Sequence, residues 1–248
     1  MIVLVTVVLE NFRAVRRAAR RHGRPTPGAL GSPEPIDDAL VDQMGGRMLA
    51  IDWTRRSVVG SWSLPTPAGL AWPRADGPLR IASAYDDALL TFDPQSGIVG
   101  RISLPAMNDL HSVIPDGDGL LLTASGVDAV LRLGVDGRLD RAWWATASGL
   151  DRTPTGTRRV LDPAADHRGR RYPTLARAVH PTAARRVAGR VLVAAFHRGC
   201  IYEVAPDTGT WTTVRDGLDH PHGLTPIRPS TRAAWALPGD ASLLVCDT

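Results

Sequence analysis

Residues 190–214, RVLVAAFHRGCIYEVAPDTGTWTTV, contain three short apolar runs separated by two breaks. The first break is the HRG tripeptide and the second is the turn sequence PDTG. Short runs rich in β-branched and aromatic residues, divided by Gly and Asp, are typical of antiparallel strands joined by tight turns. This stretch therefore predicts three consecutive strands of one sheet.

The pattern recurs in two other regions of the chain, residues 79–102 (LRIASAYDDALLTFDPQSGIVGRI) and residues 120–142 (LLLTASGVDAVLRLGVDGRLDRA). A weaker copy of its later half lies at residues 48–62. Repeated units built only of strands indicate a β-propeller, an all-β fold whose blades are four-stranded antiparallel sheets around a central channel. We expect five blades, or six if the long loops contain further strands. The last blade is expected to combine both termini or to stay incomplete, as in a shortened relative of a longer propeller.

The length and composition fit one domain over residues 1–248, with irregular insertions at about 11–45 and 145–175. All 29 basic residues are Arg, which indicates a GC-rich codon bias of the kind found in actinobacteria. A chain without Lys cannot form a Schiff base through a lysine. The net charge of +4 and the local Arg clusters, without interleaved aromatic residues, argue against a nucleic-acid partner.

The N-terminal sequence MIVLVTVVLENF lacks a basic segment and reaches an acidic residue after nine positions, so we expect neither a signal peptide nor a membrane span. Residues 11–22 have helical composition and a basic face, for which a solvated surface is the main interpretation and an acidic or membrane partner the alternative. Cys200 and Cys246 lie in apolar strand patterns and are expected to be buried thiols. These features together predict a cytoplasmic protein.

Histidines occur at particular points of the predicted blades. In a blade, the innermost strand starts at one end of the channel, and the turn between the second and third strands returns to that end. His111, His180 and His222 stand at the starts of innermost strands. His197 lies in the second turn of its blade, and Asp86 lies in the matching turn two blades earlier. The fold is therefore expected to bring these side chains to one channel mouth.

Two kinds of chemistry suit such a cluster. His111, His180 and His222 are the predicted ligands of a divalent metal such as zinc, with a position left open for water or substrate. In a metal-free alternative, one of these histidines acts as general acid or base and a nearby carboxylate of Asp86, Asp109 or Asp219 orients it. In either case His197 and Asp86 are the predicted auxiliary acid and base. A purely structural interpretation also remains, in which each imidazole bonds a backbone carbonyl of the neighbouring blade.

The polar segment at residues 145–174 is long for a connection and is expected to form a lid over the same mouth. Its arginines are predicted to bind an anionic substrate group, Tyr172 is a candidate proton donor, and Trp144 is a candidate stacking surface. The predicted substrate-binding arginines are Arg168, Arg170 and Arg171.

Three segments resemble the NHL-type, gluconolactonase-like and virginiamycin B lyase-like propellers: residues 111–137 (HSVIPDGDGLLLTASGVDAVLRLGVDG), 191–209 (VLVAAFHRGCIYEVAPDTG) and 220–224 (HPHGL). The resemblance covers most of residues 47–248. It implies a site at the channel mouth, His-based as in the lyases or a carboxylate-based calcium site as in the lactonases. Asn108 is the only Asn in the blade region and Glu is scarce, so the His set resembles the lyase-like branch more.

The sequence therefore predicts a propeller enzyme, a lyase, isomerase or hydrolase acting on a small molecule or peptide. No phosphate-binding loop and no GxSxG motif occurs. The alternative is a non-catalytic propeller that binds another protein. An enzyme should gather the histidines at one point, whereas a scaffold should disperse them and expose an apolar patch elsewhere. The sequence leaves the oligomeric state open.

Overall fold

The computed structural model describes residues 1–8, 10–11, 17, 45–71, 77–226, 232–236 and 243–247. These residues form five antiparallel sheets and four short 3-10 helices. The helix expected at residues 11–22 falls almost wholly outside the described residues. Within the described regions of the chain, no helix combines the length and apolar character that a membrane crossing requires.

Three of the sheets have four strands each, in simple up-and-down order. The second sheet contains β4 (Pro67–Ala71), β5 (Leu79–Ser83), β6 (Ala88–Asp93) and β7 (Gly97–Ile102). The third contains β8 (Leu110–Asp116), β9 (Gly119–Ala124), β10 (Ala129–Leu133) and β11 (Leu139–Trp144). The fourth contains β12 (Pro181–Val187), β13 (Arg190–Ala195), β14 (Cys200–Val204) and β15 (Trp211–Arg215).

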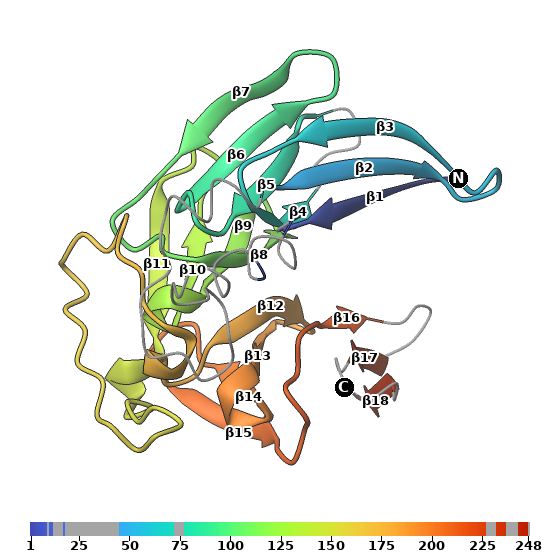
Figure 1. The fold of residues 1–248 in the computed structure, drawn as a ribbon. Coiled ribbons are helices and arrows are strands. Elements are labelled where there is room, and N and C mark those ends of the chain that lie inside the picture. Colours follow the sequence, from blue (N-terminus) through green and yellow to red (C-terminus); the bar gives the residue numbers. More distant parts are fainter. Residues whose placement is uncertain are drawn as a thin grey trace.

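The first and last sheets each have three described strands. The N-terminal sheet contains β1 (Ile2–Val7), β2 (Arg47–Asp52) and β3 (Ser57–Ser63), and the C-terminal sheet contains β16 (Thr225–Pro226), β17 (Arg232–Ala236) and β18 (Leu243–Asp247). Figure 1 shows the five sheets following one another in an arc, with the N-terminal and C-terminal sheets at its two ends. The strands β1, β4, β8 and β12 contact one another in that order along the inner side. This arrangement confirms the predicted all-β propeller fold.

The turns that end each third strand form as the sequence predicts. In the DPQSG turn, the Asp93 carboxylate accepts the backbone N–H of Gln95 at 2.9 Å and of Ser96 at 2.8 Å. Gly97 then takes a positive φ of 79°, a conformation that costs glycine little. In the shorter VDG turn, the Asp136 carboxylate accepts the backbone N–H of Arg138 at 3.0 Å, and Gly137 between them also has a φ of 79°. Side-chain bonds to the backbone thus set the register of the outer strands.

The hydrophobic core lies between neighbouring sheets. Leu110, Leu122 and Leu131 are fully buried in the cluster around the third sheet, and Val193 is fully buried in the cluster between the third and fourth sheets. Cys200 is a free thiol and only 3% exposed, as expected from its strand pattern. Because both faces of these inner strands are covered, they form near-continuous apolar runs in the sequence.

Candidate functional site at the channel mouth

Each four-stranded sheet presents the residue just before its innermost strand at the same end of the channel. These residues are Thr66, Asp109 and His180, with positive φ values of 35°, 46° and 54°. The carbonyl of each accepts a backbone N–H from the turn between the second and third strands of its own sheet. The donors are Ala84 at 3.0 Å, Ser125 at 3.0 Å and Phe196 at 3.1 Å, respectively. The strand start and the turn therefore form one rigid unit, repeated in three sheets.

This repeat corrects one expectation about the histidines. His180 is the equivalent of Asp109, whereas His111 lies two residues further along, inside β8. Before the last sheet, His220 has a positive φ of 48°, and His222 follows it by two residues. The predicted trio thus occupies two different positions of the repeat. His180, like His220, takes the positive-φ position and precedes a proline, whereas His111 and His222 lie two residues after that position. The structure nonetheless brings all three side chains together.

Buried aspartates connect each sheet to the next. Asp128, in the turn before β10, is completely buried and has a positive φ of 53°. Its carboxylate accepts the backbone N–H of Ala178 at 2.8 Å, of Val179 at 3.0 Å and of His180 at 2.7 Å. Three charge-assisted bonds fix the backbone from which the His180 ring projects. Asp128 was not among the site residues predicted from the sequence.

Asp87 has the equivalent role between the second and third sheets. Its carboxylate accepts the backbone N–H of Asp109 at 2.8 Å and of Gly169 at 2.7 Å. Burial raises the pKa of Asp87 to about 6, against the opposing effect of these bonds and of Arg171. The signal for both aspartates was present in the sequence as an Asp-Ala pair at the start of the third strand, in YDDAL and GVDAV.

Four imidazoles gather at this mouth, and we call His111, His180, His197 and His222 the imidazole cluster. The His111 ring centre lies 5.1 Å from that of His180 and 5.3 Å from that of His222. The His180 and His197 ring centres are 5.1 Å apart. Phe196 packs against His180 at 5.1 Å and His222 at 5.9 Å between ring centres. Side chains separated by up to 111 positions in the sequence thus meet within contact distance.

Hydrogen bonds define how the nitrogens of the cluster are used. The Nε2 of His197 lies 2.8 Å from the carbonyl oxygen of Thr174, which can only accept, so this nitrogen carries the proton. The Nε2 atoms of His111 and His180 are 3.5 Å apart. The Nδ1 of His180 is buried and has no hydrogen-bond partner among the described residues. An unpaired buried nitrogen costs stability, so His180 is a candidate for a functional role.

The pKa values of all four imidazoles are lowered, mainly because burial disfavours the charged ring. The pKa of His111 falls to about 4, with the nearby His222 and Arg177 adding to the effect and Asp109 opposing it. The pKa of His180 lies well below its usual range because of burial and the Arg177 charge. Burial also lowers the pKa of His197 and, although its ring is partly open to solvent, that of His222. The cluster is therefore neutral at pH 7.

Residues 145–177, which we call the cover loop, follow β11 and lead towards β12 (yellow to orange in Figure 1). Three of its arginines each pair with an aspartate of the propeller: Arg159 with Asp128, Arg171 with Asp87, and Arg177 with Asp109. Asn108 adds two bonds, from its Nδ2 to the carbonyls of His167 at 2.7 Å and Arg170 at 2.8 Å. The cover loop is thus tied to two sheets.

The arginines predicted to bind substrate have different surroundings. Arg168 pairs with Asp166, and Arg171 donates to Asp87 and to the carbonyl of Tyr85. Arg170 is exposed, and no ion pair of its side chain is found among the described residues. Binding of an anionic group by these arginines stays a prediction.

The remaining predicted residues are held by their neighbours. The Nε2 of His167 donates to the Asp162 carbonyl at 2.9 Å, so its Nδ1 accepts the Tyr172 hydroxyl proton at 2.9 Å. Trp144 is only 8% exposed and packs against His167, so its ring is not an open stacking surface. The Asp86 carboxylate pairs with Arg101 of β7. Tyr85, not Asp86, takes the position in its turn that His197 takes in the fourth sheet.

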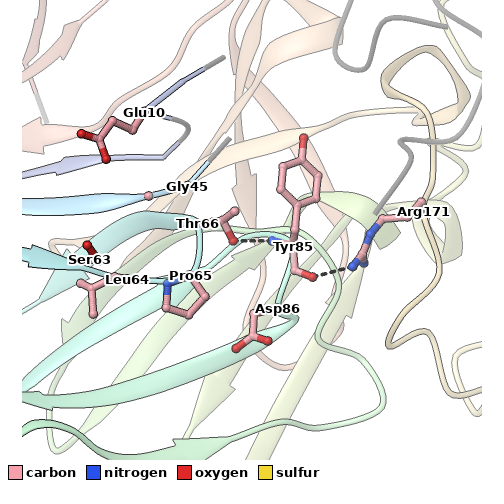
Figure 2. Close-up of a pocket in the computed structure, with 10 residues that line it drawn as sticks. Glu10, Gly45, Ser63, Leu64, Pro65, Thr66, Tyr85, Asp86 and Arg171 are labelled. Carbon is pink, nitrogen blue, oxygen red and sulfur yellow. Dashed lines mark hydrogen bonds between the residues drawn. The ribbon is translucent and has the colours of Figure 1, made fainter. Parts of the chain in front are cut away.

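A cavity of 540 Å³ lies at the same end of the molecule, between the N-terminal and second sheets. Thr66, Tyr85, Asp86 and Arg171 line one side of it, and Glu10 lines the other (Figure 2). The Thr66 hydroxyl accepts the backbone N–H of Tyr85 at 3.0 Å. Burial raises the pKa of the Tyr85 phenol, so the hydroxyl stays protonated. The recess is thus lined by Thr66 and Tyr85, which hold in the second sheet the positions that His180 and His197 hold in the fourth.

The three predicted metal ligands are only partly assembled. Among the described residues, no group of three His, Cys, Asp or Glu side chains is arranged to hold a metal ion. His111 and His180 do offer two nitrogens 3.5 Å apart, close to the roughly 3.3–3.4 Å expected between two nitrogen ligands of tetrahedral zinc. Metal binding by the trio therefore stays a prediction.

No protein-family model and no curated protein matches the sequence. Solved structures do match the fold. Virginiamycin B lyase from Staphylococcus aureus superposes with a TM-score of 0.50 at 11% identity, over 82% of this chain and 63% of the lyase. The chain shares the fold of that propeller. It spans less than two thirds of the lyase's length, so the match concerns architecture and not activity.

Two further structures give the same result. A protein of unknown function from Bacteroides caccae matches with a TM-score of 0.50 at 12% identity, over 81% of this chain and 69% of that one. A chain of a mitotic checkpoint complex matches with a TM-score of 0.51 at 12% identity, over 81% of this chain and 55% of that one. The same architecture thus occurs in an enzyme and in a protein assembly, and the site must carry any functional argument.

Proposed function

We propose that this propeller is an enzyme that acts on a small molecule or peptide at the imidazole cluster. The observation that carries the proposal is the convergence of four neutral imidazoles from three sheet starts and one turn, with His111 and His180 in nitrogen-to-nitrogen contact at 3.5 Å. Buried titratable groups without full hydrogen bonding cost stability and are concentrated at functional sites.

Proton transfer is the chemistry that this arrangement favours. A neutral imidazole accepts a proton at its free nitrogen and returns it later in the reaction. His222 is exposed and can meet a substrate, and His111 lies between it and His180. In a lyase or an isomerase, His222 would take a proton from the substrate and return it to the leaving group or to another carbon. In a hydrolase, it would take the proton from the attacking water and return it to the leaving group. The reaction classes are therefore a lyase, an isomerase or a hydrolase.

The test is an activity screen with matched variants. A panel of lyase, isomerase and hydrolase substrates is incubated with the full chain, with His222→Asn and with His220→Asn, and products are followed by mass spectrometry. His220 is the control because its ring is exposed and its Nδ1 is held by Asp219 at 2.6 Å. We expect turnover by the parent and the control and a loss of about 10²–10⁴-fold in His222→Asn. Equal turnover in all three proteins would refute the proposal.

Metal-assisted catalysis is the second candidate, favoured by the 3.5 Å separation of the His111 and His180 Nε2 atoms. If zinc were held there, it would supply Lewis-acid polarisation or a bound water of lowered pKa. Elemental analysis of the purified chain, beside a variant with His111, His180 and His222 changed to Ala, tests this. About one equivalent of a divalent ion that disappears in the variant supports the metal site, and no ion above the variant's background contradicts it.

The scaffold alternative has less support. It expects dispersed histidines, each bonded to backbone. His167 and His197 do bond carbonyls, but His111, His180 and His222 gather around one point. The geometry therefore favours the enzyme.

A further inference from the structure

The cover loop contains a cavity of its own, separate from the recess beside Tyr85. It measures 450 Å³ and is lined only by residues between positions 153 and 176. Its walls come from two stretches, one around Val160 and Leu161 and the other around Pro173 and Leu175. The volume lies within the range of roughly 300–1,000 Å³ that small-molecule sites occupy.

The wall of this cavity is apolar and carries no uncommitted charge. Val160, Leu161, Pro173 and Leu175 present carbon atoms to it. The two arginines at its edge are both paired: Arg158 with Asp151 at 2.7 Å, and Arg159 with the buried Asp128. The only other polar groups at the wall are threonine hydroxyls and the Tyr172 phenol. An occupant would therefore be an uncharged, apolar group.

Val160 is exposed although the backbone beside it is held in place by the contacts of Arg159. Val160 is 81% exposed, whereas the adjacent Arg159 is only 8% exposed and bonds Asp128 and the Gly126 carbonyl. Tyr172, across the cavity, is held by His167 on its hydroxyl and covered by the Arg159 guanidinium, 4.9 Å above its ring. The cavity is thus preformed, and a ligand would not have to order it.

Among the residues that the structure describes, the segment that lines one side of the cavity contacts the imidazole cluster through a single residue, Thr174, which is not itself a lining residue. Thr174 lies between the lining residues Pro173 and Leu175, and its carbonyl accepts the His197 Nε2–H at 2.8 Å. We propose that this cavity is a subsite that binds an apolar side chain or acyl group of the molecule that reacts at the imidazole cluster. The role as a subsite rests on the proposed function, but binding of an apolar group to the cavity can be measured independently of any turnover.

The test uses N-phenyl-1-naphthylamine, an uncharged apolar probe whose fluorescence rises on leaving water. The full chain is titrated beside Val160→Asp, which introduces a charge at the cavity rim, and Val160→Trp, which fills it. Val99→Asp is the matched control, because Val99 is 55% exposed on β7 of the second sheet. Circular dichroism verifies the fold of each variant.

We expect saturable probe binding that weakens at least tenfold in both Val160 variants and is unchanged in Val99→Asp. No saturable binding by the parent, or equal binding by parent and Val160 variants, would overturn the subsite. The variant His222→Asn separates the two proposals: it should keep probe binding while losing turnover. If probe binding depends on Val160 but turnover does not change in His222→Asn, the cavity binds an apolar group and the proposed function is wrong.

Discussion

At the scale of single residues, the neutral state of the buried histidines has a measurable consequence for stability. His111 has a pKa of about 4 in the folded chain and about 6.5 when unfolded. Between these values the unfolded chain binds the proton and the folded chain does not, so the free energy of unfolding falls as the pH falls from 6.5 to 4. The contribution of His111 alone is up to about 3 kcal/mol at pH 4.

The measurement is urea unfolding at several pH values between 4 and 7, for the parent and for His111→Gln. We expect the free energy of unfolding of the variant to fall less steeply on acidification. The slope against pH should be smaller by the equivalent of up to one bound proton. Parallel curves for the two proteins would show that His111 titrates normally in the folded chain.

Gly126 gives a second test at this scale. It lies in the turn that precedes Asp128, and a Cβ placed on it would sit 1.7 Å from the Oδ1 of Asn108. Asn108 is 1% exposed and holds two carbonyls of the cover loop, so it cannot move aside cheaply. We expect Gly126→Ala to lower the free energy of unfolding by about 1–3 kcal/mol. Gly100→Ala is the control, because a Cβ placed there would meet only the Thr91 side chain, at 3.3 Å. Gly156 is unsuitable although the space around it is open, because its φ of 82° would strain any other residue.

At the scale of elements, the strands and turns were predictable from sequence because they depend on local pattern. The three copies of strand, break, strand, turn and strand correspond to β5–β7, β9–β11 and β13–β15. The cover loop was not predictable to the same depth. Arg168, Arg170 and Arg171 were expected to bind a substrate, but Arg171 pairs with an aspartate 84 positions away. Arg159, which was not among the predicted site residues, pairs with an aspartate 31 positions away. Such distant pairs leave no local signal.

The cover loop can be tested through the pair that holds it most deeply. Asp128 and Arg159 are 0% and 6% exposed, so loss of one partner leaves the other charged and buried. We expect Arg159→Met to cost about 3–5 kcal/mol of unfolding free energy, and the double variant Asp128→Asn/Arg159→Met to recover some of that loss. The fourth member of the cycle, Asp128→Asn, completes the measurement. Strictly additive effects would mean that the pair does not couple the loop to the propeller.

At the scale of the whole molecule, the propeller converts scattered residues into one site. Each sheet repeats the same strand start and turn, so chemically different residues at equivalent positions face a common mouth. The sequence predicted this convergence because the topology dictates it. The sequence did not predict that His111 lies two residues further along the repeat than His180. Both histidines follow an apolar residue near the start of a strand, so the local pattern does not distinguish them. Positive φ at Thr66, Asp109, His180 and His220 reveals the true alignment.

Four imidazoles converge at this mouth in the neutral form. Long-range nitrogen–proton NMR correlation of the histidine-labelled chain from pH 4 to 8, assigned with single His→Asn variants, tests it most directly. We predict neutral rings for His111, His180, His197 and His222 at pH 7, with His111 titrating only near pH 4 and His197 protonated on Nε2. Titration of two or more of these rings near pH 6.5, as for free imidazoles, would contradict the account.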